Sequence, residues 1–322
     1  MTYSRIAATG SYLPERTLTN ADLEGMVETS DEWIRTRTGI EERHIVGDTQ
    51  ATSDLCIEAA KAAMADGGFA PTDIDLIVVG TTTPDLVFPN VATILQQKLG
   101  IPPCPAFSVE AACTGFLYAL STADKFVRAD ESRCALVIGA ESLSRIVDWT
   151  DRNTCVLFGD GAGAVILTPS DDPGIYSTHL GADGQYGELL YASSGASRFK
   201  DDADRGKPVI RMTGNEVFKV AVKTLGSVAE TALTANGLTH ADIDWLVPHQ
   251  ANTRIIQATA KRLGLSMDKV ILTVAQHGNT SAASVPLALD TAIRDGRIQR
   301  GHTLLFEAFG GGFTWGSALV RY

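Results

Sequence analysis

The feature that most constrains the fold of this chain is a faint internal duplication. Residues 73–80, Asp-Ile-Asp-Leu-Ile-Val-Val-Gly, are matched by residues 242–249, Asp-Ile-Asp-Trp-Leu-Val-Pro-His. Each segment follows a stretch with helical patterning that closes with glycine. The later strand-like runs also correspond, 135–140 with 303–308 and 161–167 with 314–320. The duplication predicts two similar halves built on the same succession of strands and helices.

Short β-branched runs alternate with helical patterns of about ten residues or more, which is typical of βαβ units. We therefore predict an α/β fold with mostly parallel sheets and helices on their faces. The halves meet in the turn-rich segment 168–174, which divides the chain into 1–172 and 173–322. Residues 193–208, rich in Ser, Asp, Arg and Gly, are predicted to form a surface excursion.

Composition excludes several classes of protein. The 322 residues are 44% hydrophobic and 20% charged, as in a soluble globular protein, and no apolar run approaches the roughly 18 residues of a membrane span. The N-terminus does not resemble a secretory signal. The net charge of −11 disfavours binding to nucleic acid or anionic membranes. The five cysteines are odd in number and lack CxxC pairing, which favours free thiols in the cytoplasm.

Cys113 is the strongest candidate for a nucleophile. It ends the strand-like segment 105–113, and the apolar helical pattern 114–120 follows at once. A thiol at such a junction lies at the positive end of a helix dipole, which favours the thiolate. Most free cysteines are buried and inert, and the other four fit that description. The sequence therefore predicts that Cys113 is the reactive thiol.

Two partners for this thiol come from the second half of the chain. His249 ends the apolar run 245–247, and Asn279 lies in His-Gly-Asn-Thr-Ser at 277–281. The Asn279 motif is also good turn chemistry, which on its own favours a structural role. Groups at the carboxyl ends of strands in open α/β sheets collect at one edge, so the duplication predicts a site at the seam between the halves.

Two further segments point to binding. Gly-Gly-Gly at 310–312, flanked by Phe309 and Phe313, permits close approach of backbone to a ligand and predicts an oxyanion hole together with the N–H of Cys113. The cations of the next segment, Arg254, Lys261 and Arg262, share one face of a predicted helix. That face is either a solvated surface or a docking site for an acidic partner.

The motifs together resemble those of the β-ketoacyl-acyl-carrier-protein synthase III family, the initiating condensing enzymes of fatty acid synthesis. The resemblance spans nearly the whole chain and rests on long motifs at 10–14, 31–39, 111–113, 158–163, 248–252, 277–284 and 307–316. It implies a thiolase-like fold, with two duplicated α/β halves in a five-layer α-β-α-β-α arrangement, and a homodimer.

The resemblance also implies a mechanism. Cys113 accepts an acyl group from acyl-CoA, and the backbone N–H groups of Cys113 and Gly311 hold the oxyanion. His249 and Asn279 then hydrogen-bond the thioester carbonyl of malonyl-carrier-protein and stabilise the enolate left by decarboxylation. The enolate attacks acyl-Cys113 to give a 3-oxoacyl-carrier-protein and CO2. No metal and no cofactor is expected, because acyl-CoA is a substrate.

Binding residues follow from the same resemblance. It implies that Trp33 and Arg152 enclose the adenine of CoA and that Arg37 contacts the phosphates. It assigns Phe309 to the acyl pocket, and Phe88 to the acyl pocket of the neighbouring subunit. The segment that contacts the acidic acyl carrier protein is Gln250, Ala251, Asn252, Thr253 and Arg254. The primer is acetyl-CoA or a similar thioester, with a longer or branched acyl-CoA as the alternative.

Three other enzyme classes compete with this interpretation. A papain-like protease has Cys, His and Asn in the same order, but it would carry disulfides and would lack the duplication. A thiolase would use a second cysteine where this chain has the Asn279 motif. An elongating ketoacyl synthase would use two histidines with its cysteine. Asn279 therefore favours the synthase III interpretation.

Overall fold

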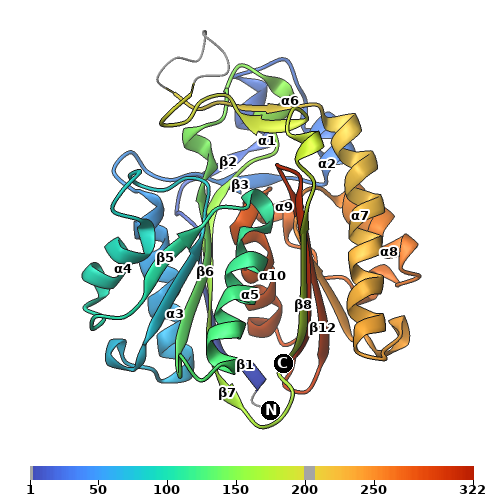
Figure 1. Cartoon of the computed structure of the whole chain (residues 1–322). Helices are drawn as coiled ribbons and strands as arrows, with labels where there is room; N and C mark the ends of the chain where they lie inside the picture. The colour runs from blue at the N-terminus through green and yellow to red at the C-terminus, as the bar shows by residue number, and fades with distance from the viewer. Residues whose placement is uncertain (1–2, 199–206) are drawn as a thin grey trace.

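In the computed structural model, which describes residues 3–198 and 207–322, two sheets enclose a pair of central helices (Figure 1). The first sheet has the order β1-β7-β6-β4-β5, with bounds β1 Tyr3–Tyr12, β4 Leu76–Gly80, β5 Ala106–Val109, β6 Ala135–Ser142 and β7 Asp160–Ser170. The second has the order β11-β12-β13-β8, with bounds β8 Ile175–Ala182, β11 Trp245–Pro248, β12 Thr303–Gly310 and β13 Thr314–Arg321. Corresponding strands of the duplication therefore occupy corresponding places in the two sheets.

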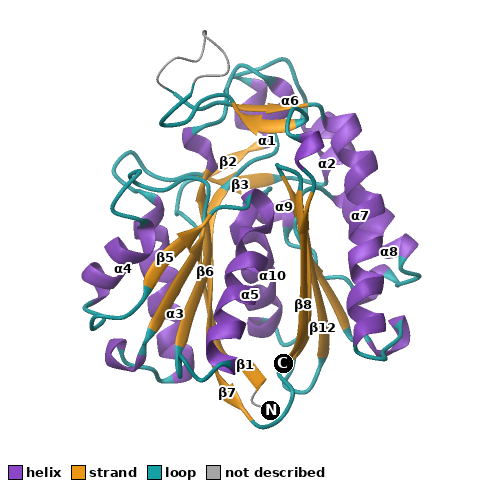
Figure 2. Ribbon diagram, viewed as in Figure 1, coloured by secondary structure: helices purple, strands orange, loops and turns teal. Residues whose placement is uncertain are grey.

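The helices complete the five layers (Figure 2). The central pair is α5 Gly115–Arg128 and α10 Ser284–Arg294, and each of these helices contacts both sheets. The outer helices are α3 Thr52–Gly67 and α4 Val91–Leu99 on the first sheet, and α7 Gly214–Ala235 and α8 Thr253–Arg262 on the second. The predicted α/β class and its layering are confirmed. The division at residue 172 falls in the turn between β7 and β8, and as a domain boundary it stays a prediction.

A smaller layer of short elements covers one end of the sheets. Its helices are α1 Asn20–Glu24, α2 Asp31–Thr38, α6 Arg152–Cys155 and α9 Val274–His277, and its strands are β2 Thr17–Thr19, β3 Glu42–His44, β9 Leu190–Ala192 and β10 Ile210–Met212. The surface excursion expected at 193–208 lies partly outside the described residues. Within the part that the structure describes, no helix is long and apolar enough to cross a membrane.

The expectation of mostly parallel sheets is wrong. Three pairings are parallel (β4 with β5, β4 with β6, β11 with β12), whereas β1 with β7, β6 with β7, β12 with β13 and β13 with β8 are antiparallel. A parallel return needs a crossover of about a dozen residues or more. Only residues 311–313 join β12 to β13, so that pair must turn back antiparallel.

Small residues let the two halves approach at the centre of the molecule. A Cβ added to Gly139 of β6 would lie 2.2 Å from the carbonyl oxygen of Ala282. Ala282 belongs to the 3-10 turn Ser281–Ala283 that leads into α10. That turn contacts the 3-10 turn Ala112–Thr114, which leads into α5. The starts of the two central helices therefore meet where the chemistry of the two halves was predicted to meet.

Candidate active site

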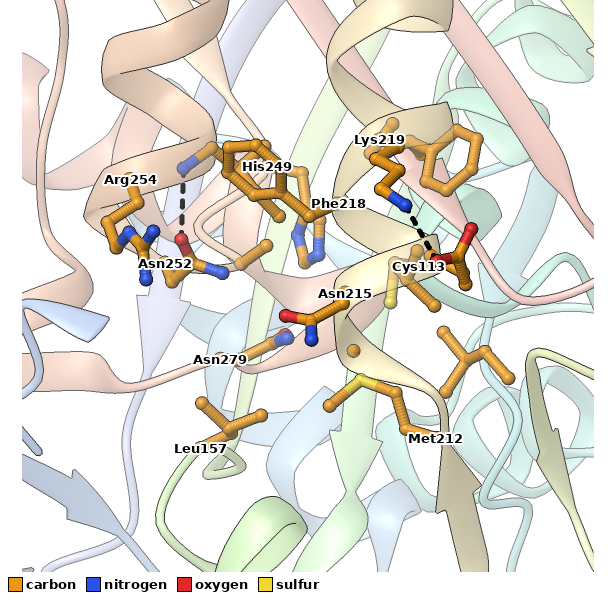
Figure 3. Close-up of a pocket in the computed structure, with 18 of the residues that line it drawn as sticks. Cys113, Leu157, Met212, Asn215, Phe218, Lys219, His249, Asn252, Arg254 and Asn279 are labelled. Carbon is orange, nitrogen blue, oxygen red and sulfur yellow. Dashed lines mark hydrogen bonds and ion pairs between the residues drawn. The ribbon is translucent and has the colours of Figure 1, made fainter. Parts of the chain in front are cut away.

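Cys113, His249 and Asn279 line one cavity of about 550 Å³ (Figure 3). Cys113 lies in the turn between β5 and α5, His249 directly follows β11, and Asn279 lies between α9 and the turn into α10. Their exposed fractions are 8%, 6% and 6%. The structure thus brings together the three residues that the sequence singled out, from both halves of the chain.

Two opposing influences act on the thiol of Cys113. It does lie at the N-terminal end of α5, behind Ala112, whose φ of 46° places the backbone in the left-handed region. Burial nevertheless raises the pKa of the Cys113 thiol to about 12, and the charge of Glu141 adds to this effect. Desolvation therefore opposes the helix dipole at this thiol, and the expectation that the helix favours the thiolate stays a prediction.

His249 is a neutral imidazole whose position is fixed by contacts to its Nδ1 and to its backbone. Its Nδ1 lies 2.6 Å from the Oγ of Ser284, and its backbone N–H donates to the carbonyl oxygen of Glu307 at 2.8 Å. Burial lowers the pKa of His249 to about 3. The Ser284 oxygen already accepts the N–H of Gln250 at 3.3 Å. A Ser284 hydroxyl that donates to Nδ1 leaves the ring proton on Nε2, where it can be donated into the cavity.

Asn279 is fixed on both backbone and side chain. Its Oδ1 accepts the backbone N–H of Ser281 at 2.9 Å, and its backbone N–H donates to Leu157 at 2.8 Å. The carbonyl of Asn279 in turn accepts the N–H of Gly159 at 3.0 Å. With Oδ1 engaged, the amide Nδ2 is the group that remains to donate. The residue therefore combines the turn role and the donor role that the sequence left open.

The glycine turn packs directly on the nucleophile. A Cβ added to Gly310 would lie 2.6 Å from the backbone nitrogen of Cys113, whereas one added to Gly311 would first meet the carbonyl of Leu190 at 3.0 Å. Among backbone hydrogen bonds outside the helices and strands of the described chain, none is donated by the N–H of Cys113 or of Gly311. Both N–H groups are thus candidates for an oxyanion hole, and Gly310 provides the space.

Two cations contact the ring of one aromatic side chain. The guanidinium carbon of Arg37 lies 4.5 Å from the ring centre of Trp33, and that of Arg152 lies 4.7 Å from it. Arg152 also donates to the carbonyl oxygen of Glu28 at 2.8 Å. Arg37 lines the cavity that contains Cys113. The three predicted nucleotide-binding residues therefore form one cluster connected to the nucleophile.

The segment from Gln250 to Arg254 divides into buried and exposed parts. Gln250 is fully buried. Its Nε2 donates hydrogen bonds to the carbonyls of Pro248 and Ile271. Its Oε1 accepts hydrogen bonds from the backbone N–H groups of Thr273 and Val274. Its predicted contact with a carrier protein is wrong, because the side chain has no free hydrogen-bonding capacity and no exposure.

The rest of that segment reaches the cavity and the surface. Asn252 caps α8 by accepting the N–H of Ile255 at 2.9 Å, and Thr253 packs against Gly39 of the loop after α2. Ala251, Asn252 and Arg254 line the cavity that contains Cys113. Arg254 is exposed and its guanidinium lies 5.9 Å from the ring centre of Phe218 in α7 (Figure 3).

A second cavity of about 1180 Å³ reaches Cys113 from another direction. Apolar side chains on its lining include Leu86, Val87, Leu143, Ile146 and Ile210. Phe309 lines the first cavity and not this one, and Phe88 lines neither. Phe88 is 83% exposed, and its assignment to an acyl pocket stays a prediction. Cys113, Phe158 and Leu190 line both cavities, so the two cavities meet at the nucleophile and these two neighbours.

Comparison with known proteins decides between the candidate classes. Family models described as 3-oxoacyl-[acyl-carrier-protein] synthase III match residues 107–184, and their C-terminal counterpart matches residues 233–322. A β-ketoacyl-[acyl-carrier-protein] synthase III of Xanthomonas campestris pv. campestris is 63% identical over 320 residues, covering 99% of this chain and 98% of that protein. The enzyme of the same name from Thioalkalivibrio sulfidiphilus is 60% identical over 322 residues, with 100% of both chains covered.

The chain belongs to the 3-oxoacyl-[acyl-carrier-protein] synthase III family.

The solved structure of a synthase III supports the same family assignment. The crystal structure of the enzyme from Aquifex aeolicus VF5 has a TM-score of 0.93 and 45% identity, and it covers 99% of this chain and 100% of that one. The thiolase-like fold and the assignment to condensing acyltransferases of fatty acid synthesis are confirmed. The protease, thiolase and elongating-synthase alternatives are set aside.

Several polar residues of this synthase III site were not singled out from the sequence. Ser281 and Ser284 lie in the recognised motif at 277–284, but their contacts with the catalytic residues depend on the tertiary fold. Glu141 lies near the end of β6 and Glu307 lies within β12, and the fold buries both fully. A carboxylate within an otherwise apolar strand pattern is the one sequence signal that could have drawn attention to them.

Proposed function

We propose that this chain condenses an acyl-CoA primer with malonyl-acyl-carrier-protein to give 3-oxoacyl-acyl-carrier-protein, CO2 and CoA. The observation that carries the proposal is the convergence of Cys113, His249 and Asn279 on one cavity. The reaction requires no metal and no cofactor, because the driving force is the loss of CO2. The reducing cytoplasm suits an enzyme whose described cysteines are all free.

The first half-reaction transfers the acyl group to Cys113. The thiolate attacks the thioester carbonyl carbon, and the oxyanion is stabilised by the N–H groups of Cys113 and Gly311. Collapse of the tetrahedral intermediate releases CoA and leaves acyl-Cys113. The close contact of Gly310 with the nucleophile supports this role for the glycine turn, since any larger residue would separate the two N–H groups.

The second half-reaction uses His249 and Asn279 as donors to the malonyl thioester carbonyl. Loss of CO2 moves negative charge onto that oxygen, and donors fixed in advance stabilise the charge without reorganisation. The low pKa of His249, about 3, supports a neutral donor in place of a cation. The enolate carbon then attacks acyl-Cys113 and the product leaves with the carrier protein.

The cluster of Trp33, Arg37 and Arg152 is proposed to hold CoA. An adenine between Trp33 and Arg152 needs about 3.5 to 4 Å on each face, more than the 4.7 Å now separating them. Arg152 must therefore release its bond to Glu28 and move outward to admit the nucleotide. Arg37 then faces the phosphates from within the cavity.

Two exposed surfaces are suited to binding other protein chains. Arg254 stands exposed beside the cavity and suits an acidic carrier protein, with Ala251, Asn252 and Thr253 of the same segment positioning it. Leu86, Val87 and Phe88 are 54%, 74% and 83% exposed, an apolar run that supports a homodimer. In that dimer Phe88 would enter the acyl cavity of the second subunit.

One assay tests the function. An acyl-CoA with malonyl-carrier-protein should yield CO2 and a 3-oxoacyl-carrier-protein, and the absence of CO2 with every primer would reject the proposal. A Cys113→Ala variant should form no radiolabelled acyl-enzyme. The size of the second cavity keeps a longer or branched primer as the alternative, which rates with acetyl-, isobutyryl- and octanoyl-CoA would distinguish.

A further inference from the structure

The helix that carries two of the proposed nucleotide-binding residues ends against the other half of the molecule. Helix α2 contains Trp33 and Arg37 and stops before Gly39, whose N–H donates to the carbonyl oxygen of Arg35. Thr253, the first residue of α8 in the second half, packs directly on this glycine. The proposed function places Thr253 in the carrier-protein segment and gives it no part in binding the nucleotide.

The contact leaves no room for a side chain at Gly39. A Cβ added there would lie 1.9 Å from Oγ1 of Thr253 and 2.8 Å from its Cβ. Rotation of the threonine would move Oγ1, but it cannot move Cβ, and a β-branched side chain has few rotamers. Carbon atoms in ordinary contact are about 3.5 Å apart or more, so a larger residue at position 39 would force the two segments apart by roughly 0.7 Å or more.

A second contact docks the same end of α2 on the second half. The N–H of Glu41 donates to the carbonyl oxygen of Ala275 in α9 at 2.8 Å. Within the first half, Nδ2 of Asn20 donates to Asp31 and to the carbonyl oxygen of Ile40, both at 2.8 Å. The place of α2 is therefore fixed by short contacts from both halves.

Of the two helices, α2 is the one that we expect to move when the contact is crowded. It is eight residues long and buries two of them. Helix α8 is ten residues long, buries four residues and packs against α7. A displacement at Gly39 therefore shifts Trp33 and Arg37, while Arg254 on α8 stays in place.

We propose that Thr253 positions the nucleotide-binding cluster through its contact with Gly39. The cluster is the set proposed above to hold CoA, namely Trp33, Arg37 and Arg152, so the inference rests on the proposed function. Trp33 and Arg37 lie on α2, whereas Arg152 lies on α6. A shift of α2 changes the distance of 4.7 Å between the Arg152 guanidinium and the Trp33 ring. The space that admits the adenine thus depends on a residue of the second half.

The competing explanation is that Gly39 serves only as the left-handed C-cap of α2. Its φ is 76°, a conformation that favours glycine whatever lies nearby. Gly68 is the matched control, because it ends α3 with a φ of 69° and its N–H donates to the carbonyl oxygen of Met64, four residues earlier. A Cβ added to Gly68 meets nothing within 4 Å. Gly39→Ala and Gly68→Ala therefore carry similar backbone strain and differ in the contact with Thr253.

The experiment compares the KM for acyl-CoA with the KM for the matching acyl-pantetheine, with malonyl-carrier-protein in excess. Acyl-pantetheine lacks the nucleotide, so the ratio of the two KM values reports the nucleotide site and is insensitive to a general loss of active enzyme. We expect Gly39→Ala to raise the ratio of acyl-CoA to acyl-pantetheine by about tenfold, since a misplacement of about 1 Å can cost up to about 10²-fold. Gly68→Ala should leave the ratio within about twofold of wild type.

A second substitution tests whether Thr253 is the residue responsible. Thr253→Gly removes the support without crowding the contact, so alone it should raise the ratio by about threefold, a test that does not depend on the folding of Gly39→Ala. It also makes room at position 39. In the Thr253→Gly background, Gly39→Ala should therefore change the ratio by no more than about twofold, a coupling that a double-mutant cycle measures.

Thermal denaturation identifies any variant that is unfolded at the assay temperature. The proposal is overturned if folded Gly39→Ala and Thr253→Gly both keep the wild-type ratio, or if Gly39→Ala raises the ratio equally with and without Thr253→Gly. Failure of the proposed function has a different signature. The wild type would then release no CO2 with any primer, or Trp33→Ala would leave the ratio unchanged.

Discussion

The hydroxyl of Ser284 lies 2.6 Å from Nδ1 of His249, at the first residue of the helix α10. Because this contact orients the ring and its Nε2 proton, Ser284→Ala should slow the step that uses His249. We expect CO2 release from malonyl-carrier-protein to fall by about tenfold, the cost of roughly one misdirected hydrogen bond. Formation of acyl-Cys113 should be unchanged and is the internal control. An equal loss in both half-reactions would show that Ser284 supports the fold and not the tautomer.

The contact between the glycine turn and Cys113 predicts that Gly310 does not tolerate a larger side chain. Gly310→Ala would place a carbon 2.6 Å from the backbone nitrogen of Cys113, which cannot rotate away as a side chain could. We expect acyl transfer to fall by at least about 10²-fold, since displacement of one oxyanion donor costs that much. Gly195→Ala, where an added carbon meets nothing within 4 Å, is the control. A fully active Gly310→Ala enzyme would contradict the packing described.

Trp33 is predicted to matter only for the nucleotide end of the primer. Loss of one aromatic stacking surface costs about 1–3 kcal/mol, so Trp33→Ala should raise the KM for acyl-CoA by about tenfold. The kcat should stay close to the wild-type value. Acyl-pantetheine, which lacks the nucleotide, should react equally well with both proteins. A larger defect with acyl-pantetheine than with acyl-CoA would place Trp33 in the core instead of the binding site.

Reversal of charge at Arg254 should affect the carrier protein and spare CoA. Arg254→Glu is expected to raise the KM for malonyl-carrier-protein by about tenfold at low salt and by less at high salt, because exposed charges are screened. Lys261→Glu changes the same charge further along α8 and serves as the matched control. The assays are carrier-protein-dependent CO2 release and acyl transfer from acyl-CoA. Equal effects of the two variants would indicate a general field and no specific docking residue.

The buried carboxyl group of Glu307 predicts that the free energy of unfolding depends on pH. Burial raises its pKa to about 8, and among the described residues neither of its oxygens has a hydrogen-bond partner. Below about pH 4.5 both folded and unfolded states carry the proton. Between that pH and 8 only the folded state keeps it, so the free energy of unfolding falls as pH rises, by up to about 1.4 kcal/mol per pH unit.

Glu307→Gln should remove this slope. Urea denaturation of the variant and wild type from pH 5 to 9 should give a difference that favours the variant increasingly toward pH 8. Glu15→Gln, on an exposed loop, should show no such trend. A constant difference at all pH values would mean that the Glu307 carboxyl is ionised in the folded protein.

Much of the site could be predicted because its signals are local. Cys113 and His249 each follow a strand pattern at once, and Asn279 is embedded in a run of small residues. The pairing of corresponding strands could also be anticipated, since the repeated segments occur in the same order in both halves.

The remaining features depend on contacts between distant segments. The close approach of Ala282 to Gly139 depends on tertiary packing, which no local pattern encodes. Gln250 sits in an apparently accessible polar motif, but Ile271, Thr273 and Val274 supply partners that bury it. Strand direction was mispredicted at β13 because its residues suit a parallel strand, while the three residues that join it to β12 permit only the antiparallel return.

The meeting of the two cavities beside Cys113 has a kinetic consequence. Once Cys113 is acylated, the chain can rest in the second cavity while CoA vacates the first, so the malonyl donor enters by the route the primer has left. The two substrates then compete for the first cavity and do not bind there at the same time. We therefore expect ping-pong kinetics, with an output in the cell that depends on the ratio of the two substrates as well as on their amounts.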